Sequence, residues 1–216
     1  MLGTHAHLVF SCPAQDGWEI ARAALGIPAS PDSARPHFRL FVGDVVAAAD
    51  REFLHALGVT HVVNCGVADL EPHDHTPHPG LRYTCVRTSD SHFAPKPAKY
   101  GTVDEAENPT SQWPAAISHL REARAAGTAA LVHCIAGANR SVTTAAVFLT
   151  VEGLVPTFAE AVKTLKAARP CAAPMATYRA WGAAACASWP PRIPSSAAGE
   201  GEMEVSVVPV PGMAKL

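Results

Sequence analysis

The stretch Leu131-Val-His-Cys-Ile-Ala-Gly-Ala-Asn-Arg-Ser141 decides both the expected fold and the expected chemistry of this chain. The apolar run at residues 129–133 predicts a buried strand, and residues 142–152 predict a helix that leaves the loop between them. A tight loop at a helix N-terminus binds anions, because its backbone N–H groups converge and the helix dipole adds partial positive charge. The stretch therefore predicts a phosphate-binding loop.

Four side chains of this stretch fit phosphoryl transfer. The helix N-terminus and Arg140 should favour the thiolate of Cys134, which is the nucleophilic form. Arg140 presents a planar fork that holds two phosphoryl oxygens at once. Ser141 can donate a hydrogen bond to the sulfur, and we expect His133 to orient the loop rather than act as an acid or base. A buried, inert thiol is the alternative for Cys134 taken alone, but the full pattern favours catalysis.

The remaining loop residues are uncharged, and we expect them to bind phosphate mainly through their backbone N–H groups. Gly137 allows a loop conformation that is closed to residues with a Cβ atom. The predicted phosphate-binding residues are Ile135, Ala136, Gly137, Ala138, Asn139 and Arg140.

Strand-like and helix-like segments alternate from residue 38 onward. Strands are predicted at residues 39–42, 60–64, 83–87 and 129–133, and helices at residues 47–57, 113–126, 142–152, 157–168 and 175–188. In the first helix, Val46, Phe53, Leu54 and Leu57 are expected to share one face. The alternation predicts one α/β domain at residues 37–188, between an N-terminal extension (1–36) and a flexible C-terminal tail (189–216). Within the extension, residues 7–10 resemble a short strand and residues 18–25 a helix.

Composition excludes several classes of protein. The 216 residues carry 17 basic and 19 acidic side chains, so bulk positive charge does not predict a nucleic-acid binder. No uninterrupted apolar stretch approaches the length of a membrane-spanning helix. The six cysteines form no C-x-x-C pair, which favours reduced thiols in the cytoplasm over a disulfide framework.

The segment His133-Cys-Ile-Ala-Gly-Ala-Asn-Arg-Ser141 resembles the H-C-x-x-G-x-x-R-S/T signature of the cysteine-dependent protein phosphatases, and specifically of the dual-specificity phosphatase family. Leu40-Phe-Val-Gly43 and Leu57-Gly-Val-Thr-His-Val-Val-Asn64 resemble the opening strands of that family, and Ala168-Arg-Pro170 followed by Pro174 resembles its R-P-x-x-x-P segment. The resemblance covers residues 38–188. It implies a central, mostly parallel sheet flanked by helices, with the site at a strand's carboxyl end.

The resemblance also implies a mechanism without metal or cofactor. Cys134 attacks phosphorus to form a phosphocysteine, and an aspartic acid protonates the leaving oxygen and then activates water. Asp90 follows the strand predicted at residues 83–87, as the acid does in the family. Asp104, within an apparent insertion at residues 95–110, is the second candidate.

Two departures from the family pattern bear on the site. Met175 stands where the family usually has an asparagine that braces the loop. The loop also lacks the lysines typical of phosphoinositide phosphatases, which favours proteins phosphorylated on Ser, Thr or Tyr as substrates. Two alternatives stay open: a non-catalytic module that binds phosphorylated partners, and a phosphatase acting on a phosphoinositide, glucan or RNA 5′-phosphate.

Three further features carry weaker expectations. His73, His75 and His78 have a spacing that can gather a metal, although a solvated loop is favoured. Cys65 or Cys85 is a candidate for a protective disulfide with Cys134. Finally, Ala214-Lys215-Leu216 resembles the S-K-L peroxisomal targeting signal. Two interpretations stay open: recognition by a peroxisomal import receptor, and a chance match.

Overall fold

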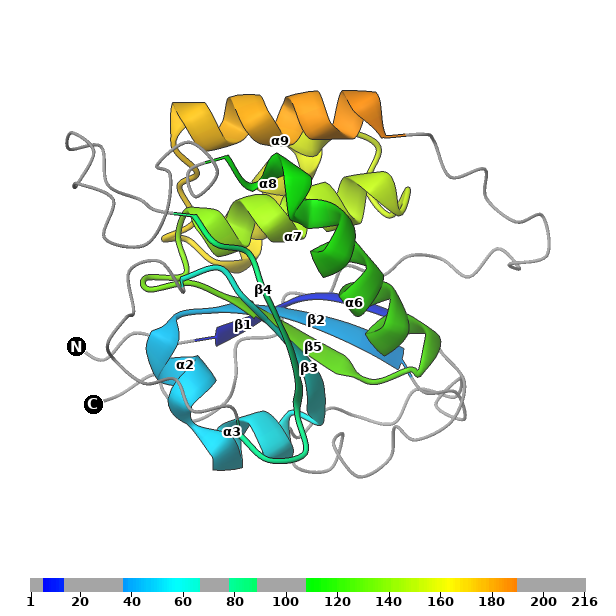
Figure 1. Cartoon of the computed structure of the whole chain (residues 1–216), viewed down its shortest axis with the longest axis vertical. Helices are drawn as coiled ribbons and strands as arrows, with labels where there is room; N and C mark the ends of the chain where they lie inside the picture. The colour runs from blue at the N-terminus through cyan, green and yellow to red at the C-terminus, as the bar shows by residue number, and fades with distance from the viewer. Residues whose placement is uncertain (1–5, 14–36, 67–77, 89–107, 190–216) are drawn as a thin grey trace.

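The computed structural model describes residues 6–13, 37–66, 78–88 and 108–189, and a five-stranded sheet lies at its centre (Figure 1). The strands are β1 (Ala6–Pro13), β2 (His37–Gly43), β3 (Val59–Asn64), β4 (Arg82–Cys85) and β5 (Ala129–His133). Their order is β1-β2-β5-β3-β4, with β1 antiparallel to β2 and the other neighbours parallel. The sheet is thus mostly parallel, as expected.

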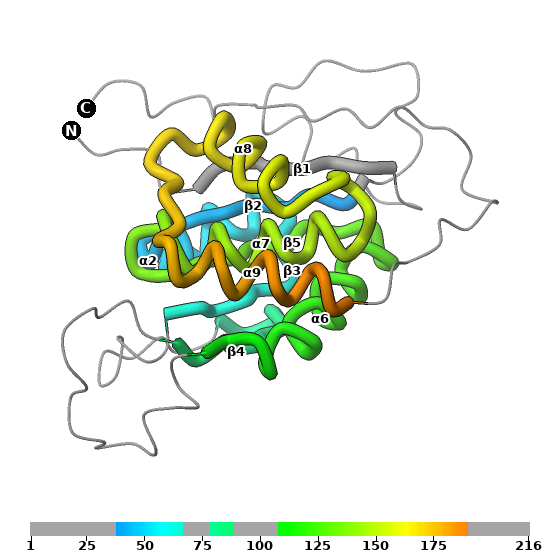
Figure 2. The backbone as a smooth tube through the Cα atoms, turned by 90° about the horizontal axis from the view of Figure 1, so that it is seen from above, coloured from blue at the N-terminus to red at the C-terminus, as the bar shows by residue number. Residues whose placement is uncertain are grey.

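Helices cover both faces of the sheet. One face carries α6 (Trp113–Ala125), α7 (Arg140–Val151), α8 (Phe158–Ala168) and α9 (Ala176–Ser188), and the other carries the short α2 (Val45–Ala49) and α3 (Arg51–Ala56). A 3₁₀ turn, η1 (Pro109–Ser111), precedes α6. Figure 2 shows α7, α8 and α9 running side by side over the sheet. The layers confirm the predicted α/β class.

The larger part of the core lies between the sheet and α6–α9. Trp113, Ile117 and Leu120 of α6 are fully buried there, as their i, i+4, i+7 spacing predicts. The indole N–H of Trp113 donates to the hydroxyl of Thr144 in α7 at 3.1 Å, so this buried polar group is satisfied. Burial therefore fixes α7, the helix that follows the phosphate loop, against the sheet and α6.

Two differences from the predicted elements change which residues are buried or paired. The helix expected at residues 47–57 is instead two helices, because Asp50 leaves helical geometry and its carboxylate caps Phe53 N–H at 2.9 Å. Val46 consequently does not share the buried face and is 53% exposed. The strand expected at residues 83–87 ends at Cys85.

Some expectations fall outside the described residues and stay predictions. These are the helix at 18–25, the catalytic aspartate (Asp90 or Asp104), His73, His75, the C-terminal tail and the tripeptide Ala214-Lys215-Leu216. The strand expected at residues 7–10 is found as β1, which pairs with β2 although it precedes the predicted domain boundary. Among the described residues, no helix is long and apolar enough to cross a membrane.

Candidate active site

The predicted phosphate loop occupies the carboxyl end of the central strand. Residues 134–139 connect β5, which lies between β2 and β3, to the first turn of α7. Residue 134 therefore sits where the parallel strands end and a helix N-terminus begins. Cys134 is only 1% exposed. The strand–loop–helix geometry predicted from the sequence is confirmed.

Ser141 contacts the sulfur of Cys134. The distance between Cys134 Sγ and Ser141 Oγ is 3.2 Å, and the Ser141 side chain is fully buried. A thiolate can only accept a hydrogen bond, so the Ser141 hydroxyl is the donor whenever Cys134 is ionised. The contact can thus stabilise the sulfur as an attacking group and as a leaving group.

Arg140 is the first residue of α7, and its side chain is 1% exposed. One of its guanidinium nitrogens, Nη1, donates to the backbone carbonyl of Thr88 at 3.2 Å. The Thr88 hydroxyl in turn bonds the phenol of Tyr178 in α9. This chain of contacts fixes the guanidinium beside the loop, and it joins α7, α9 and the segment that follows β4.

The loop carbonyls are turned outward by donors from two neighbouring segments, the start of α2 and the connection between α8 and α9. The contacts are Val45 N–H to Ile135 O (3.1 Å), Arg169 Nη2 to Ala136 O (3.2 Å), Arg169 Nε to Gly137 O (2.7 Å) and Ala173 N–H to Ala138 O (2.8 Å). Because four successive carbonyls face outward, the loop N–H groups are left to face the centre. Such a nest of N–H groups binds an anion.

Gly137 is required by both conformation and space. Its φ is +65°, in the left-handed region that favours glycine. A Cβ atom at this position would lie 2.6 Å from Arg169 Nη2 and 2.6 Å from the carbonyl oxygen of Gly43. The glycine therefore lets the loop approach both β2 and the guanidinium of Arg169.

Asn139 braces the loop by accepting a hydrogen bond from the main chain of residue 175. The backbone N–H of Met175 donates to Asn139 Oδ1 at 2.9 Å. Met175 lacks the asparagine side chain usual in the family, but the same position still holds the loop through its main chain. The brace therefore depends on Asn139, which is buried.

Arg169 and Asp44 are site residues that our sequence analysis did not single out. Arg169 is buried, and its Nη2 lies 3.5 Å from Asp44 Oδ2. The other oxygen of Asp44 caps α2 by accepting from the N–H groups of Val46 and Ala47. Arg169 belongs to the R-P-x-x-x-P segment, and that motif was the only signal that could have identified it.

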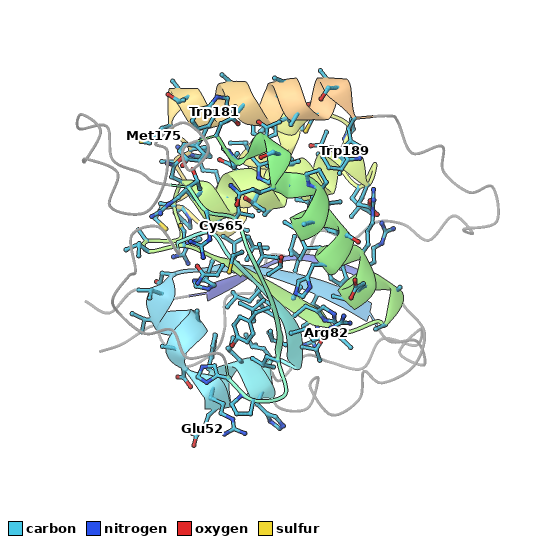
Figure 3. The ribbon with its side chains drawn as sticks, in the orientation of Figure 1. Glu52, Cys65, Arg82, Met175, Trp181 and Trp189 are labelled. Atoms are coloured by element: carbon cyan, nitrogen blue, oxygen red, sulfur yellow. The ribbon has the colours of Figure 1, made fainter. Side chains whose placement is uncertain are left out.

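Two cysteines near the site differ in burial. The backbone N–H of Cys65 donates to the His133 carbonyl at 2.7 Å, which places it beside the end of β5 (Figure 3). Burial raises the pKa of the Cys65 thiol to about 12, and its sulfur lies 3.5 Å from Thr144 Oγ1. Cys85 is exposed. The predicted disulfide with Cys134 stays a prediction.

A family model described as the dual specificity phosphatase catalytic domain matches residues 40–181. This chain belongs to the dual-specificity phosphatase family. The match begins within β2 and includes β3–β5, the whole loop, Arg140 and Arg169.

Curated dual-specificity phosphatases of vertebrates and plants resemble the chain. It is 33% identical over 139 residues to dual specificity protein phosphatase 22-B of Danio rerio, covering 62% of this chain and 63% of that protein. The values for dual specificity protein phosphatase 22 of Homo sapiens are 32%, 62% and 63%. Dual specificity protein phosphatase 1 of Arabidopsis thaliana is 29% identical, with 64% and 61% covered. The chain thus spans less than two thirds of the length of these relatives.

Solved structures of the dual-specificity phosphatase family share the fold. The crystal structure of human DUSP28 is 25% identical, has a TM-score of 0.54, and the match covers 68% of this chain and 86% of that one. A mouse putative dual specificity phosphatase, 24% identical, has a TM-score of 0.55, with 68% and 80% covered. These neighbours support the α/β phosphatase fold.

Proposed function

We propose that this chain is a cysteine-dependent phosphatase that hydrolyses phosphomonoesters on proteins through a phosphocysteine intermediate. One observation carries the proposal. Cys134 Sγ lies 3.2 Å from Ser141 Oγ. Cys134 begins a loop whose carbonyls point outward, and Arg140 follows that loop as the first residue of α7. A nucleophile, a stabilising hydroxyl and an anion cradle thus occupy one helix N-terminus.

The reaction has two displacement steps. In the first, the Cys134 thiolate forms the S–P bond as the P–O ester bond breaks, and an acid protonates the departing oxygen. In the second, water loses a proton to the same group and attacks phosphorus, so the S–P bond breaks and the thiolate returns. Arg140 and the loop N–H groups stabilise the charge of the equatorial oxygens in both steps, and Ser141 stabilises the released thiolate.

Asp90 is the proposed acid and base. It stands two residues after Thr88, whose carbonyl accepts from Arg140. Asp90→Ala should lower turnover of an alkyl phosphate at least about 100-fold, with a smaller effect on an aryl phosphate, since phenolate leaves without protonation. Asp104→Ala is the comparison variant. A larger loss in Asp104→Ala than in Asp90→Ala would transfer the role to Asp104.

Phosphoproteins are the proposed substrates. The side chains at Ile135, Ala136 and Ala138 carry no charge to meet the extra phosphates of a phosphoinositide. The relatives reported above are named as protein phosphatases. Phosphopeptides, phosphoinositides and a small aryl phosphate should be assayed side by side, with Cys134→Ser as control. Cys134-dependent turnover of phosphopeptides supports the proposal, whereas turnover confined to phosphoinositides contradicts the substrate class.

A further inference from the structure

Two histidines and a glutamate gather away from the catalytic loop, in the first half of β3 and on α6. His61 of β3 is paired with Arg82 of β4, and His119 and Glu122 lie three residues apart on α6. Each of the three residues offers one ligand atom, and these three atoms all lie within 4.8 Å of one another. Figure 3 places Arg82 toward one end of α6, away from Cys65 at the catalytic end of β3.

A chain of hydroxyl groups sets the tautomer of His61. The hydroxyl of Thr60 donates to Thr128 Oγ1 at 2.6 Å, and that hydroxyl donates to the carbonyl of Ala123 at 3.3 Å. Thr60 Oγ1 also lies 2.8 Å from His61 Nδ1. Since the proton of Thr60 is already engaged, the His61 Nδ1–H must be the donor in this contact. The lone pair of His61 is therefore on Nε2.

That Nε2 lone pair is buried. His61 is 4% exposed, and its Nε2 has no hydrogen-bond partner among the residues that the structure describes. A buried polar atom left unsatisfied costs free energy, so such atoms call for an explanation. A bound cation would satisfy it.

His119 is oriented in a complementary way. Its Nε2 lies 3.2 Å from the backbone carbonyl of Arg82. A carbonyl can only accept, so Nε2 carries the proton and Nδ1 carries the lone pair. Imidazole metal ligands commonly donate their second N–H to a carbonyl or hydroxyl in this manner, which fixes the ring for coordination. Both rings thus donate one N–H to a protein oxygen, as metal-binding imidazoles do.

Both histidines are held in the neutral form. Burial lowers the pKa of His61 to about 4, and the positive charge of the Arg82 guanidinium acts in the same direction. Burial likewise lowers the pKa of His119. Neutral imidazole is the form that coordinates metal ions. The rings contact each other edge to face with centroids 4.8 Å apart.

Glu122 supplies a carboxylate at the solvent side of the pair. Its Oε2 pairs with Arg82 Nη2 at 2.8 Å, and both side chains are about half exposed or more. Ligands of a tetrahedral zinc ion lie roughly 3.3 Å apart, because each bond is about 2.0–2.1 Å. The three ligand atoms lie within 4.8 Å of one another, so they must approach further to bind an ion. Glu122 is exposed and free to move toward the histidines, and Arg82 can turn toward water.

We propose that His61, His119 and Glu122 bind a divalent transition-metal ion with the ligand preferences of Zn²⁺. Two imidazole nitrogens and a carboxylate oxygen are ligands that suit zinc, and water would complete the coordination. The ion would connect β3 to α6 on the sheet face that carries the larger core. This site is independent of the phosphate loop.

A zinc titration of the full chain carrying Cys134→Ser tests the proposal, since that change removes the reactive thiol from competition. Bound zinc is measured by equilibrium dialysis and Tm by calorimetry. His119→Gln and Glu122→Gln are each added to this background. His55→Gln and Glu52→Gln are the matched controls, because they change the same residue types at exposed positions of α3.

The parent should bind about one more equivalent of zinc than His119→Gln, and its Tm should rise with zinc in a way that EDTA reverses. Glu122→Gln should weaken this site at least about 10-fold, and both controls should match the parent. Glu122 is exposed, so its variant decides the matter if His119→Gln does not fold. Equal zinc content and an equal Tm shift in the parent and Glu122→Gln would overturn the proposal, as would the absence of bound zinc in the parent.

Discussion

The two ends of the sheet present opposite sets of polar atoms. At the carboxyl end of β5, donors such as Arg169 form hydrogen bonds with the loop carbonyls. The loop N–H groups and Arg140 are therefore the groups available to bind a ligand. Near the start of β3 and β4, the N–H groups of His61 and His119 donate to a hydroxyl and to a carbonyl. The second ring nitrogen of each histidine keeps its lone pair. The first end therefore suits an anion and the second a cation. The comparison shows that the protein's own hydrogen bonds decide which charge each end can bind.

Replacing the cation at the anion-binding end should have the largest effect. Arg140→Lys keeps one positive charge but loses the planar fork, so we expect a fall in kcat of about 10²–10³-fold on a phosphopeptide. The matched control is Arg179→Lys, at an exposed position of α9, which should retain full activity. A change below threefold in Arg140→Lys would mean that a point charge suffices and that the fork has no role.

Gly137→Ala tests the shape of the same end. The new Cβ would meet Arg169 Nη2 and the Gly43 carbonyl at 2.6 Å, and φ of +65° disfavours alanine. We expect kcat to fall by about 10²-fold, because displaced loop N–H groups no longer meet the transferring phosphoryl oxygens. Gly153→Ala has a similar φ but open space around it, so it should lower Tm without lowering kcat. Equal kcat in the two variants would contradict the argument.

Arg169 acts as a positioning residue, so its effect should be smaller. Arg169→Lys loses at least one of the two bonds to the carbonyls of Ala136 and Gly137, and we expect kcat to fall about 10-fold. KM should change much less than kcat if the loop amides act mainly in the transition state. Asp44→Asn, which weakens the 3.5 Å ion pair and keeps an oxygen to cap α2, should cost less than Arg169→Lys. The reverse order would place Asp44 closer to the reaction than proposed.

The smallest effect on turnover is expected at the histidine end. His119→Gln should leave kcat and KM within about twofold of the parent, since distant sites act additively when they share no partners. Steady-state kinetics without added zinc measures this directly. A loss of kcat as large as that of Arg169→Lys would show that the two ends are coupled and would contradict the claim that they act independently.

The phosphate-binding loop was predictable because its determinants are contiguous in the sequence. The loop follows the strand directly and includes Cys134 and Gly137, and Arg140 comes next. One local pattern therefore predicts both the strand–loop–helix structure and the binding of phosphate. The helix predicted from residue 157 also begins through a local contact, because the Glu160 N–H donates to Thr157 Oγ1 at 3.2 Å.

Contacts between distant segments were not predictable in the same way. Arg169 reaches the loop only because α8 ends beside it, and its partners lie more than 30 residues earlier in the chain. The His61–His119 contact requires knowing that α6 packs on β3. The break between α2 and α3 does not follow from apolar spacing, which continues across it; it follows from the carboxylate of Asp50, which caps α3.

The most direct test of the central claim is to trap the covalent intermediate. The chain is mixed rapidly with a labelled phosphopeptide, quenched in acid and digested, and the labelled peptide is identified by mass spectrometry. Our account predicts phosphate on Cys134 within the first turnover and none in Cys134→Ser. Turnover without a phosphorylated Cys134, or turnover that persists in Cys134→Ser, would contradict it.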